Sequence, residues 1–210
     1  AQAVDIVTRC TDRALDTLDT VSQVRLRDLM MPIWAEFYYE LVFAEPCPPE
    51  ARDLIVGNAD DVVTALKCCG LRHMDRRERL TAYLVRRIEA GEIPHKLPES
   101  FTVQEQAWYL QGAFFNTAVV QSSEAMAHLL MAIAQHRDVQ AGLFAGTEDI
   151  GHVMDEALRL YPLFGVAHRI TTGDIRTGTH TIPTGSVLLF NYAKFHQAGF
   201  DHPTFLFPTR

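Results

Sequence analysis

The stretch Asp155-Glu-Ala-Leu-Arg-Leu-Tyr-Pro162 places a carboxylate and a guanidinium three residues apart. Thr147 can cap a helix that runs from the next residue to Leu160, and the proline at the end of the stretch closes it, because proline cannot continue the hydrogen-bond ladder. A helix brings Glu156 and Arg159 onto one face, where the two side chains can pair. Most pairs of this kind are exposed and contribute less than about 1 kcal/mol. The pair alone therefore identifies no function.

The chain before this helix has the periodicity of further helices. Apolar residues recur at helical spacing in four segments, and turn residues separate one segment from the next. The segments are residues 4–18, 28–43, 50–66 and 75–90. Thr102 and Glu105 then form the capping-box pattern that opens a helix. The apolar segment after them continues to about Gln135, and a helix of about 30 residues would be about 45 Å long. We therefore expect one long central helix that crosses the whole domain.

The chain changes character after residue 167. Thr-rich, β-prone stretches begin at His168, and glycine or proline interrupts them at positions 173, 178, 183 and 185, which is typical of short strands and hairpins. The predicted fold class is mainly α with minor β. We expect a single domain over residues 1–210, mostly helical over residues 1–166, with short strands and an irregular meander over residues 167–210.

The composition excludes several classes of protein. The 210 residues carry a formal net charge of −7 and their basic residues are scattered, so no nucleic-acid partner is expected. No apolar run is long enough for a membrane segment, and acidic residues among the first twenty exclude a signal peptide there. The cysteines fit neither a zinc site nor a disulfide framework, and they are Cys10, Cys47, Cys68 and Cys69. Reduced thiols in a cytoplasmic protein are expected.

Four landmarks in order along the chain resemble the cytochrome P450 family, over residues from about Leu29 to Arg210. The helix with Glu156 and Arg159 and its trailing proline resembles that family's Glu-x-x-Arg helix. The later landmarks resemble the strand after that helix, an Ile-Pro-x-Gly hairpin and the meander before the haem loop. They are His168-Arg-Ile-Thr171 with Gly173-Asp-Ile175, then Thr181-Ile-Pro-Thr-Gly-Ser-Val-Leu-Leu189, then Phe200-Asp-His-Pro203 with Pro208-Thr-Arg210.

The resemblance implies a partial cytochrome P450 fold and a haem-dependent monooxygenase. Such an enzyme oxidises a small, mostly apolar organic substrate with electrons from a ferredoxin-type or flavin redox partner, and the haem carries the oxygen chemistry. No metal ligand is expected within this chain, because the family's cysteine thiolate lies in a Gly-rich loop that would follow shortly after Arg210. A helix with a second propionate contact would precede Ala1. The chain is thus expected to be a fragment, inactive and without a stable haem complex on its own.

The resemblance also implies roles for individual residues. Glu156 and Arg159 would form a buried pair that, with a third residue from the meander, holds the proximal side of the haem pocket. Many members carry arginine at that third position, where a gapless alignment gives Phe205, with Arg210 nearby as a substitute. Arg169 matches a position that binds a haem propionate, since a cationic fork suits a carboxylate. A solvated arginine on a strand is the alternative.

The central helix departs from the family pattern. That helix usually carries a glycine, an acid two residues later and then a threonine, a group that relays protons to iron-bound oxygen. The segment His136-Arg-Asp-Val-Gln140 is similar to the loop after this helix, and counting back from it places Thr117-Ala-Val-Val-Gln-Ser122 at the relay. Val120 and Gln121 then replace the acid and the alcohol. Valine cannot carry a proton, and glutamine can only form hydrogen bonds.

This segment nevertheless supplies the candidates for the site. Gln121 and Ser122 are the catalytic candidates, and the hydroxyl of Ser122 or Thr117 could hold a water in place of the usual relay. Ala118 is the candidate for a haem contact on the central helix, beside Arg169 on the strand. Ala118 and Gln121 could equally be core packing, and the alternative for the relay is that the count is displaced by one helical turn.

Two further functions are compatible with the same residues. The altered relay fits a P450-like enzyme that rearranges, couples or cyclises its substrate. Some proteins that resemble this family lack the cysteine, bind no haem and activate another enzyme such as a glycosyltransferase. The residues just after Arg210 distinguish the last possibility, because a Gly-rich loop with cysteine there would indicate haem.

Overall fold

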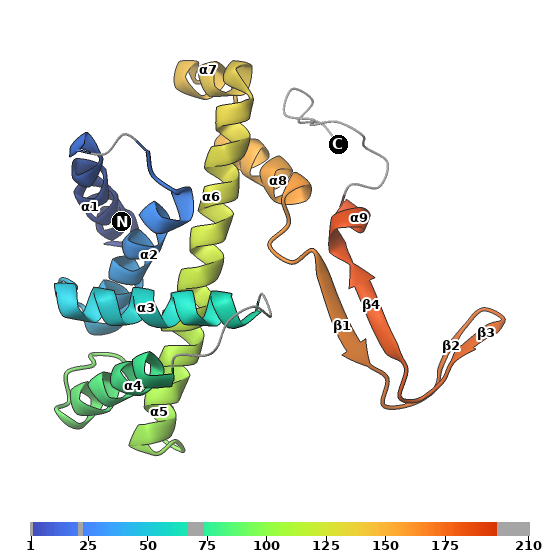
Figure 1. The fold of residues 1–210 in the computed structure, drawn as a ribbon, viewed down its shortest axis with the longest axis horizontal. Helices are drawn as coiled ribbons and strands as arrows, with labels where there is room; N and C mark the ends of the chain where they lie inside the picture. The colour runs from blue at the N-terminus through green and yellow to red at the C-terminus, as the bar shows by residue number, and fades with distance from the viewer. Residues whose placement is uncertain (1, 21–22, 67–73, 197–210) are drawn as a thin grey trace. The chain divides into compact units, whose positions relative to one another are not determined.

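The computed structural model describes residues 2–20, 23–66 and 74–196, and the chain divides into two compact units, residues 1–127 and 128–210 (Figure 1). In the described ranges, helices occupy most of the chain up to residue 160, and short strands appear only after residue 165. The predicted class, mainly α with minor β, is confirmed. Among these residues, no helix combines the length and the apolar character that crossing a membrane requires.

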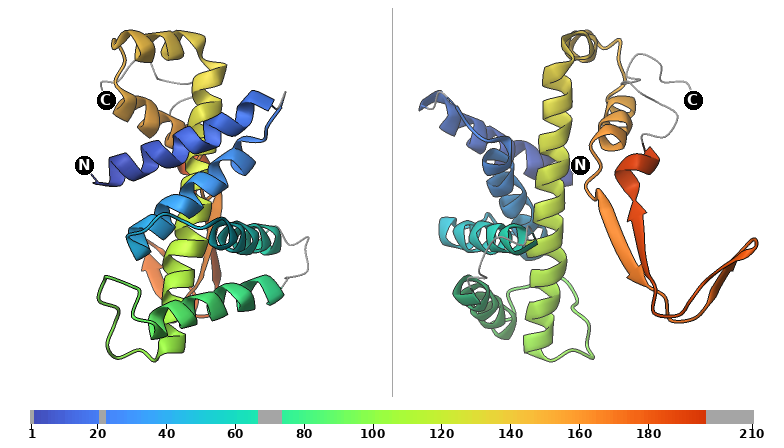
Figure 2. Two further views of the ribbon diagram at one scale, coloured as in Figure 1. Left: turned by 90° about the vertical axis from the view of Figure 1, so that its left-hand side faces the viewer. Right: turned by 45° about the vertical axis from the view of Figure 1, so that its right-hand side comes forward.

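The first unit is a set of helices around one apolar core. Its elements are α1 (Gln2–Asp16), the 3₁₀ turn η1 (Thr17–Thr20), α2 (Leu26–Phe43), α3 (Pro49–Leu66), α4 (Met74–Glu89), α5 (Val103–Leu110) and η2 (Gln111–Ala118). Helix α1 packs on α2, and α3 and α4 cross the central helix on its core side (Figure 2). The core joins α2, α3, α4 and the central helix through buried side chains such as Tyr39, Ile55, Leu84 and Phe115.

The long central helix is confirmed. Segments α5, η2 and α6 (Val119–Gln135) follow one another without a break (Figure 2). The helix begins at the predicted capping box, where Thr102 Oγ1 accepts a hydrogen bond from the Glu105 amide and Glu105 Oε2 accepts one from the Thr102 amide. Every fourth residue from Gln111 to Ala127 is buried, so one side of the helix faces the core. Segment η2 is π-helical, which the sequence did not predict.

Over its described residues, the second unit contains the end of α6, three helices and two small sheets. Its elements are α7 (Arg137–Ala145), α8 (Ile150–Leu160), β1 (Val166–Ile170), β2 (Ile175–Thr177), β3 (His180–Ile182), β4 (Val187–Asn191) and α9 (Tyr192–His196). Strand β1 pairs antiparallel with β4, and β2 forms a hairpin with β3 (Figure 1).

Two local predictions in this unit were wrong. Thr147 does not cap α8, because its hydroxyl donates to the Gly142 carbonyl at the end of α7. The cap is Asp149, whose carboxylate accepts from the His152 amide at 3.1 Å. The segment that begins at His136 is also not a loop, since α7 starts at the next residue.

Candidate functional site

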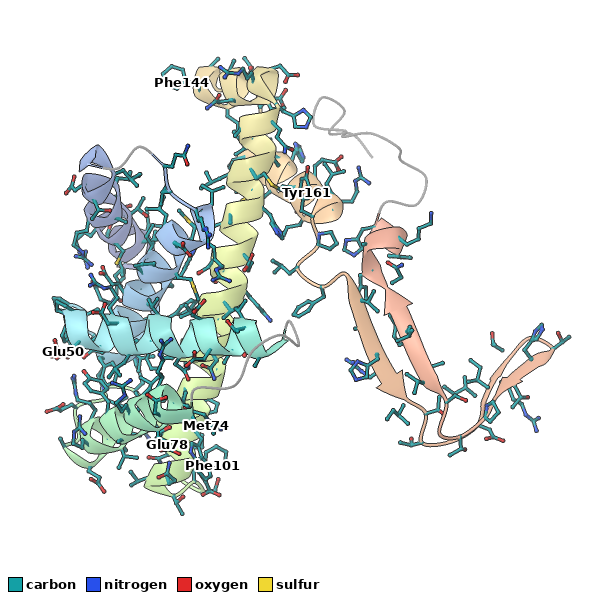
Figure 3. The ribbon with its side chains drawn as sticks, in the orientation of Figure 1. Glu50, Met74, Glu78, Phe101, Phe144 and Tyr161 are labelled. Carbon is teal, nitrogen blue, oxygen red and sulfur yellow. The ribbon has the colours of Figure 1, made fainter. Side chains whose placement is uncertain are left out.

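Helix α8 positions the predicted ion pair because it is amphipathic. Its buried residues are Val153, Glu156 and Ala157, a spacing that puts them on one helix face, against apolar residues of α6 and α7. The C-terminal end of α8 is fixed to α6, because the Tyr161 hydroxyl donates to Gln135 Oε1 at 3.0 Å. Figure 3 labels Tyr161 beside α8. A carboxylate on the core side of a helix, such as that of Glu156, needs a partner, and Arg159 on the next turn of α8 is that partner.

Glu156 and Arg159 form a two-point ion pair in the predicted manner. Arg159 Nε lies 2.6 Å from Glu156 Oε2, and Nη2 lies 2.7 Å from Oε1. The Arg159 side chain is only 12% exposed and the Glu156 side chain only 8%. Hydrogen bonding to Glu156 raises the pKa of Arg159. The third contact is the His196 carbonyl on α9, which accepts from Arg159 Nη1 at 3.1 Å. The expected third partners, Phe205 and Arg210, lie outside the described residues.

Arg169 lies on β1, opposite Leu188 of β4 in the antiparallel ladder. The side chain is exposed, and its Nη1 donates to the neighbouring His168 carbonyl at 2.7 Å. Within the described ranges, no carboxylate pairs with it. A guanidinium has five N–H donors, so most of them remain available to a carboxylate from a ligand. The structure is thus compatible with propionate binding, and the role of Arg169 stays a prediction.

The predicted relay segment, residues 117–122, has side chains on two sides of the central helix, one that faces the core and one that faces away from it. Val119 points into the core of the first unit. In a helix, positions two residues away on either side are turned by about 160° from it. These are Thr117, which is exposed, and Gln121, which is half-buried. We call Thr117, Ala118 and Gln121 the open face of the central helix.

Ser122 is turned towards α2 and away from Gln121. Its hydroxyl lies 2.8 Å from the hydroxyl of Tyr38, and the two groups share a hydrogen bond. The two catalytic candidates, Gln121 and Ser122, therefore do not point to the same place. Thr117 is the residue of the open face that carries a hydroxyl. No local pattern indicated the Tyr38 contact, because 84 positions separate the two residues.

The thiols of Cys10 and Cys47 are poor metal ligands. Burial raises the pKa of Cys10 to about 12, and it raises the pKa of Cys47 still further. Both thiols therefore remain protonated at neutral pH, whereas iron binds the thiolate. Cys68 and Cys69 lie outside the described residues. Over the described part of the chain, no group of three or more His, Cys, Asp or Glu side chains could hold a metal ion.

We expect Cys10 and Cys47 to resist thiol reagents in the folded protein. At about pH 8, a thiol with the pKa of Cys10 is a thiolate in roughly one molecule in ten thousand. The measurement is the reaction of a disulfide reagent with a Cys68→Ser/Cys69→Ser variant, before and after denaturation. Fast reaction of two thiols per chain in the native state would contradict the raised pKa of these two thiols.

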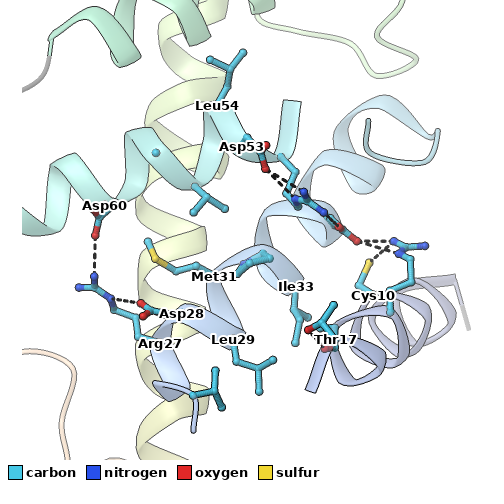
Figure 4. Close-up of a pocket in the computed structure, with 18 of the residues that line it drawn as sticks. Cys10, Thr17, Arg27, Asp28, Leu29, Met31, Ile33, Asp53, Leu54 and Asp60 are labelled. Carbon is cyan, nitrogen blue, oxygen red and sulfur yellow. Dashed lines mark hydrogen bonds and ion pairs between the residues drawn. The ribbon is translucent and has the colours of Figure 1, made fainter. Parts of the chain in front are cut away.

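A pocket of about 1650 Å³ in the first unit is lined by Cys10 and many charged residues (Figure 4). Its charges largely neutralise one another, as in the 2.7 Å pair of Arg27 with Asp60 and the 3.1 Å pair of Arg52 with Asp53. None of the predicted site residues lines this pocket. It is therefore separate from the candidate site.

No protein-family model and no curated protein matches the sequence. Solved structures do match. Ligand-free cytochrome P450 OleT is 14% identical, with a TM-score of 0.78 over 99% of this chain and 55% of its own. Cytochrome P450EX alpha with myristic acid is 15% identical, with a TM-score of 0.73 over 94% of this chain and 53% of its own. CYP175A1 from Thermus thermophilus is 17% identical, with a TM-score of 0.63 over 98% of this chain and 55% of its own.

The chain thus spans about half the length of these structures. At these identities the likeness concerns architecture. The chain has the fold of the cytochromes P450.

Proposed function

We propose that the chain is part of a haem-thiolate oxidoreductase that oxidises a small, mostly apolar organic substrate. The observation that supports it most is the buried two-point pair of Glu156 with Arg159 on α8, directly before the antiparallel pair of β1 and β4. The fold shared with cytochromes P450 supports the same proposal. Electrons would come from a ferredoxin-type or flavin partner, and the haem would supply the oxygen chemistry when bound.

The residues present fit part of a haem site. Arg169 would bind a propionate, because its guanidinium is exposed and unpaired among the described residues. Glu156 and Arg159 would hold α8 and α9 together on the proximal side without touching the substrate. Ala118, a small side chain on the open face, would leave room beside the central helix, and Gln121 would form hydrogen bonds there. The thiolate would come from a segment beyond Arg210.

Long-chain carboxylic acids are the first substrates to test. Among the similar structures, cytochrome P450EX alpha holds myristic acid, an OleT variant holds arachidonic acid and CYP120A1 holds retinoic acid. Each is a largely apolar molecule with one carboxyl group. The protonated thiols of Cys10, which is buried, and Cys47, which is half-buried, are consistent with a cytoplasmic location, where thiols stay reduced.

A second candidate is a P450-like enzyme that rearranges, couples or cyclises its substrate. Val120 cannot transfer a proton, and the Ser122 hydroxyl is engaged by Tyr38. Proton delivery by the relay segment would then depend on Thr117 alone. A third possibility, a haem-free protein that activates another enzyme, depends on whether the chain beyond Arg210 lacks the cysteine.

The test is the absorption spectrum of the complete protein, purified with haem supplied, then reduced and exposed to carbon monoxide. We expect the red-shifted Soret band of a thiolate complex from the complete protein and none from residues 1–210 alone, because the described cysteines are protonated. A thiolate-type band from the 210-residue chain would contradict the proposed source of the ligand. Its absence from the complete protein would favour the haem-free function.

A further inference from the structure

Asn58 of α3 is a buried amide that contacts the central helix at two points. Asn58 and Gln111 are each only 2% exposed. The Asn58 side-chain amide group donates to Asn116 Oδ1, and its carbonyl oxygen accepts from Gln111 Nε2 at 3.5 Å. One side chain on α3 therefore joins two residues of η2 that are five positions apart.

This spacing distinguishes a π-helix from an α-helix. In an α-helix, residues five apart are turned by about 140° from one another, so a single short side chain cannot reach both. In a π-helix the hydrogen bonds join residues five apart, which stacks such residues on one side. Gln111 and Asn116 are the first and sixth residues of the π-helical segment. The contacts of Asn58 thus match the π-helical register and not the α-helical one.

Gln111 is held from α4 as well. Its side-chain nitrogen donates to the Arg77 carbonyl at 3.1 Å, and its oxygen accepts from the Thr81 hydroxyl at 3.0 Å. Both N–H donors of this amide are therefore used, one by α3 and one by α4. Buried amides that lose a partner are destabilised by their desolvation. The polar chain from Arg77 through Gln111 and Asn58 to Asn116 therefore favours the register in which all its members are satisfied.

We propose that Asn58 is a positioning residue that holds residues 111–118 in π-helical register and thereby sets the orientation of the open face. A return to α-helical hydrogen bonds would turn Thr117 and Gln121 relative to the start of the helix, because each residue advances an α-helix by about 100°. An effect of Asn58 on a bound haem is expected only if the proposed function is correct. The control of the helical register by Asn58 is independent of the proposed function.

The first test is amide hydrogen exchange over residues 112–122 of the complete protein. We expect Asn58→Leu and Asn116→Leu each to speed exchange there by about fivefold or more, the factor that one lost hydrogen bond gives. Asn116→Asp keeps the acceptor for Asn58 and should stay close to the wild type. Tyr38→Phe removes one hydrogen bond to the same helix, at Ser122, without touching Gln111, Asn58 or Asn116, and is the matched control.

The second test uses imidazole, whose binding to haem iron shifts the Soret band. We expect both Leu variants to change the imidazole dissociation constant by about tenfold, as misplacement of a contact surface does, while Asn116→Asp does not. Unchanged exchange in both Leu variants, or an equal increase in Tyr38→Phe, would overturn control of the register by Asn58. Faster exchange with unchanged imidazole affinity would show that Asn58 stabilises the helix without setting the orientation of the open face. If the complete protein binds no haem, the proposed function fails and the exchange experiment still decides the register.

Discussion

Replacement of Arg159 by methionine is expected to destabilise the complete protein by about 3–5 kcal/mol and to abolish haem retention. The reason is that Glu156, the partner of Arg159, lies in a buried position. Glu156 is 8% exposed, and both its oxygens are hydrogen-bonded to Arg159. Without the guanidinium, the buried carboxylate would lose both of these hydrogen bonds and the charge that balances it on α8, and α8 would also lose its bond to the His196 carbonyl. Urea unfolding and the haem content of the purified variant measure the two effects.

Two further variants test this explanation. Glu156→Leu/Arg159→Met removes both charges, and we expect the double variant to be clearly more stable than Arg159→Met alone, since a buried pair can often be replaced by apolar residues at little cost. Arg176→Ala, on the exposed strand β2, is the control for loss of a surface arginine and should change stability by less than about 0.5 kcal/mol. An Arg159→Met protein that keeps its haem and its stability would contradict the structural role of the pair.

The Glu156 to Arg159 contact could be predicted from the sequence because it is local. Residues three apart meet on any helix, and the closing proline marked the helix end. The long central helix was predictable for a similar reason, since Thr102 and Glu105 cap it through neighbouring residues. Such features depend on a few consecutive positions, which the sequence displays directly.

Features that depend on distant contacts could not be predicted. The π-helical register of residues 111–118 coincides with a bridge from Asn58, which is more than fifty positions away. Ser122 was a catalytic candidate on the family pattern, but its orientation follows from Tyr38 of α2. The cap of α8 went to Asp149 because Thr147 was already engaged with α7. For Asn58 and Tyr38 the partner is distant in the sequence, whereas Thr147 and Asp149 are competing caps whose partners lie within five positions, and the sequence left the two caps equivalent.

The ion pairs between α1 and α2 should also show a large, asymmetric response to substitution. Glu36 and Glu40 on α2 are 8% and 4% exposed. Arg13 of α1 serves both, with Nη2 at 2.7 Å from Glu36 and 3.1 Å from Glu40. Arg9 serves Glu40 alone, at 2.8 Å. Arg13 is thus the one cation shared by two buried carboxylates among the described contacts.

We therefore expect Arg13→Met to lower the free energy of unfolding by about 2 kcal/mol, because it weakens the compensation of two buried charges at once, while Glu40 keeps Arg9 and Glu36 keeps Arg52 at 3.4 Å. Arg9→Met is the matched control, and about 1 kcal/mol is expected, since Glu40 keeps Arg13. Glu40→Gln should cost less than Arg13→Met, because the two arginines that it releases are about half exposed and can be solvated. Urea unfolding of the three variants measures this order. Equal losses for Arg13→Met and Arg9→Met would show that α1 is held to α2 by packing and not by the shared guanidinium.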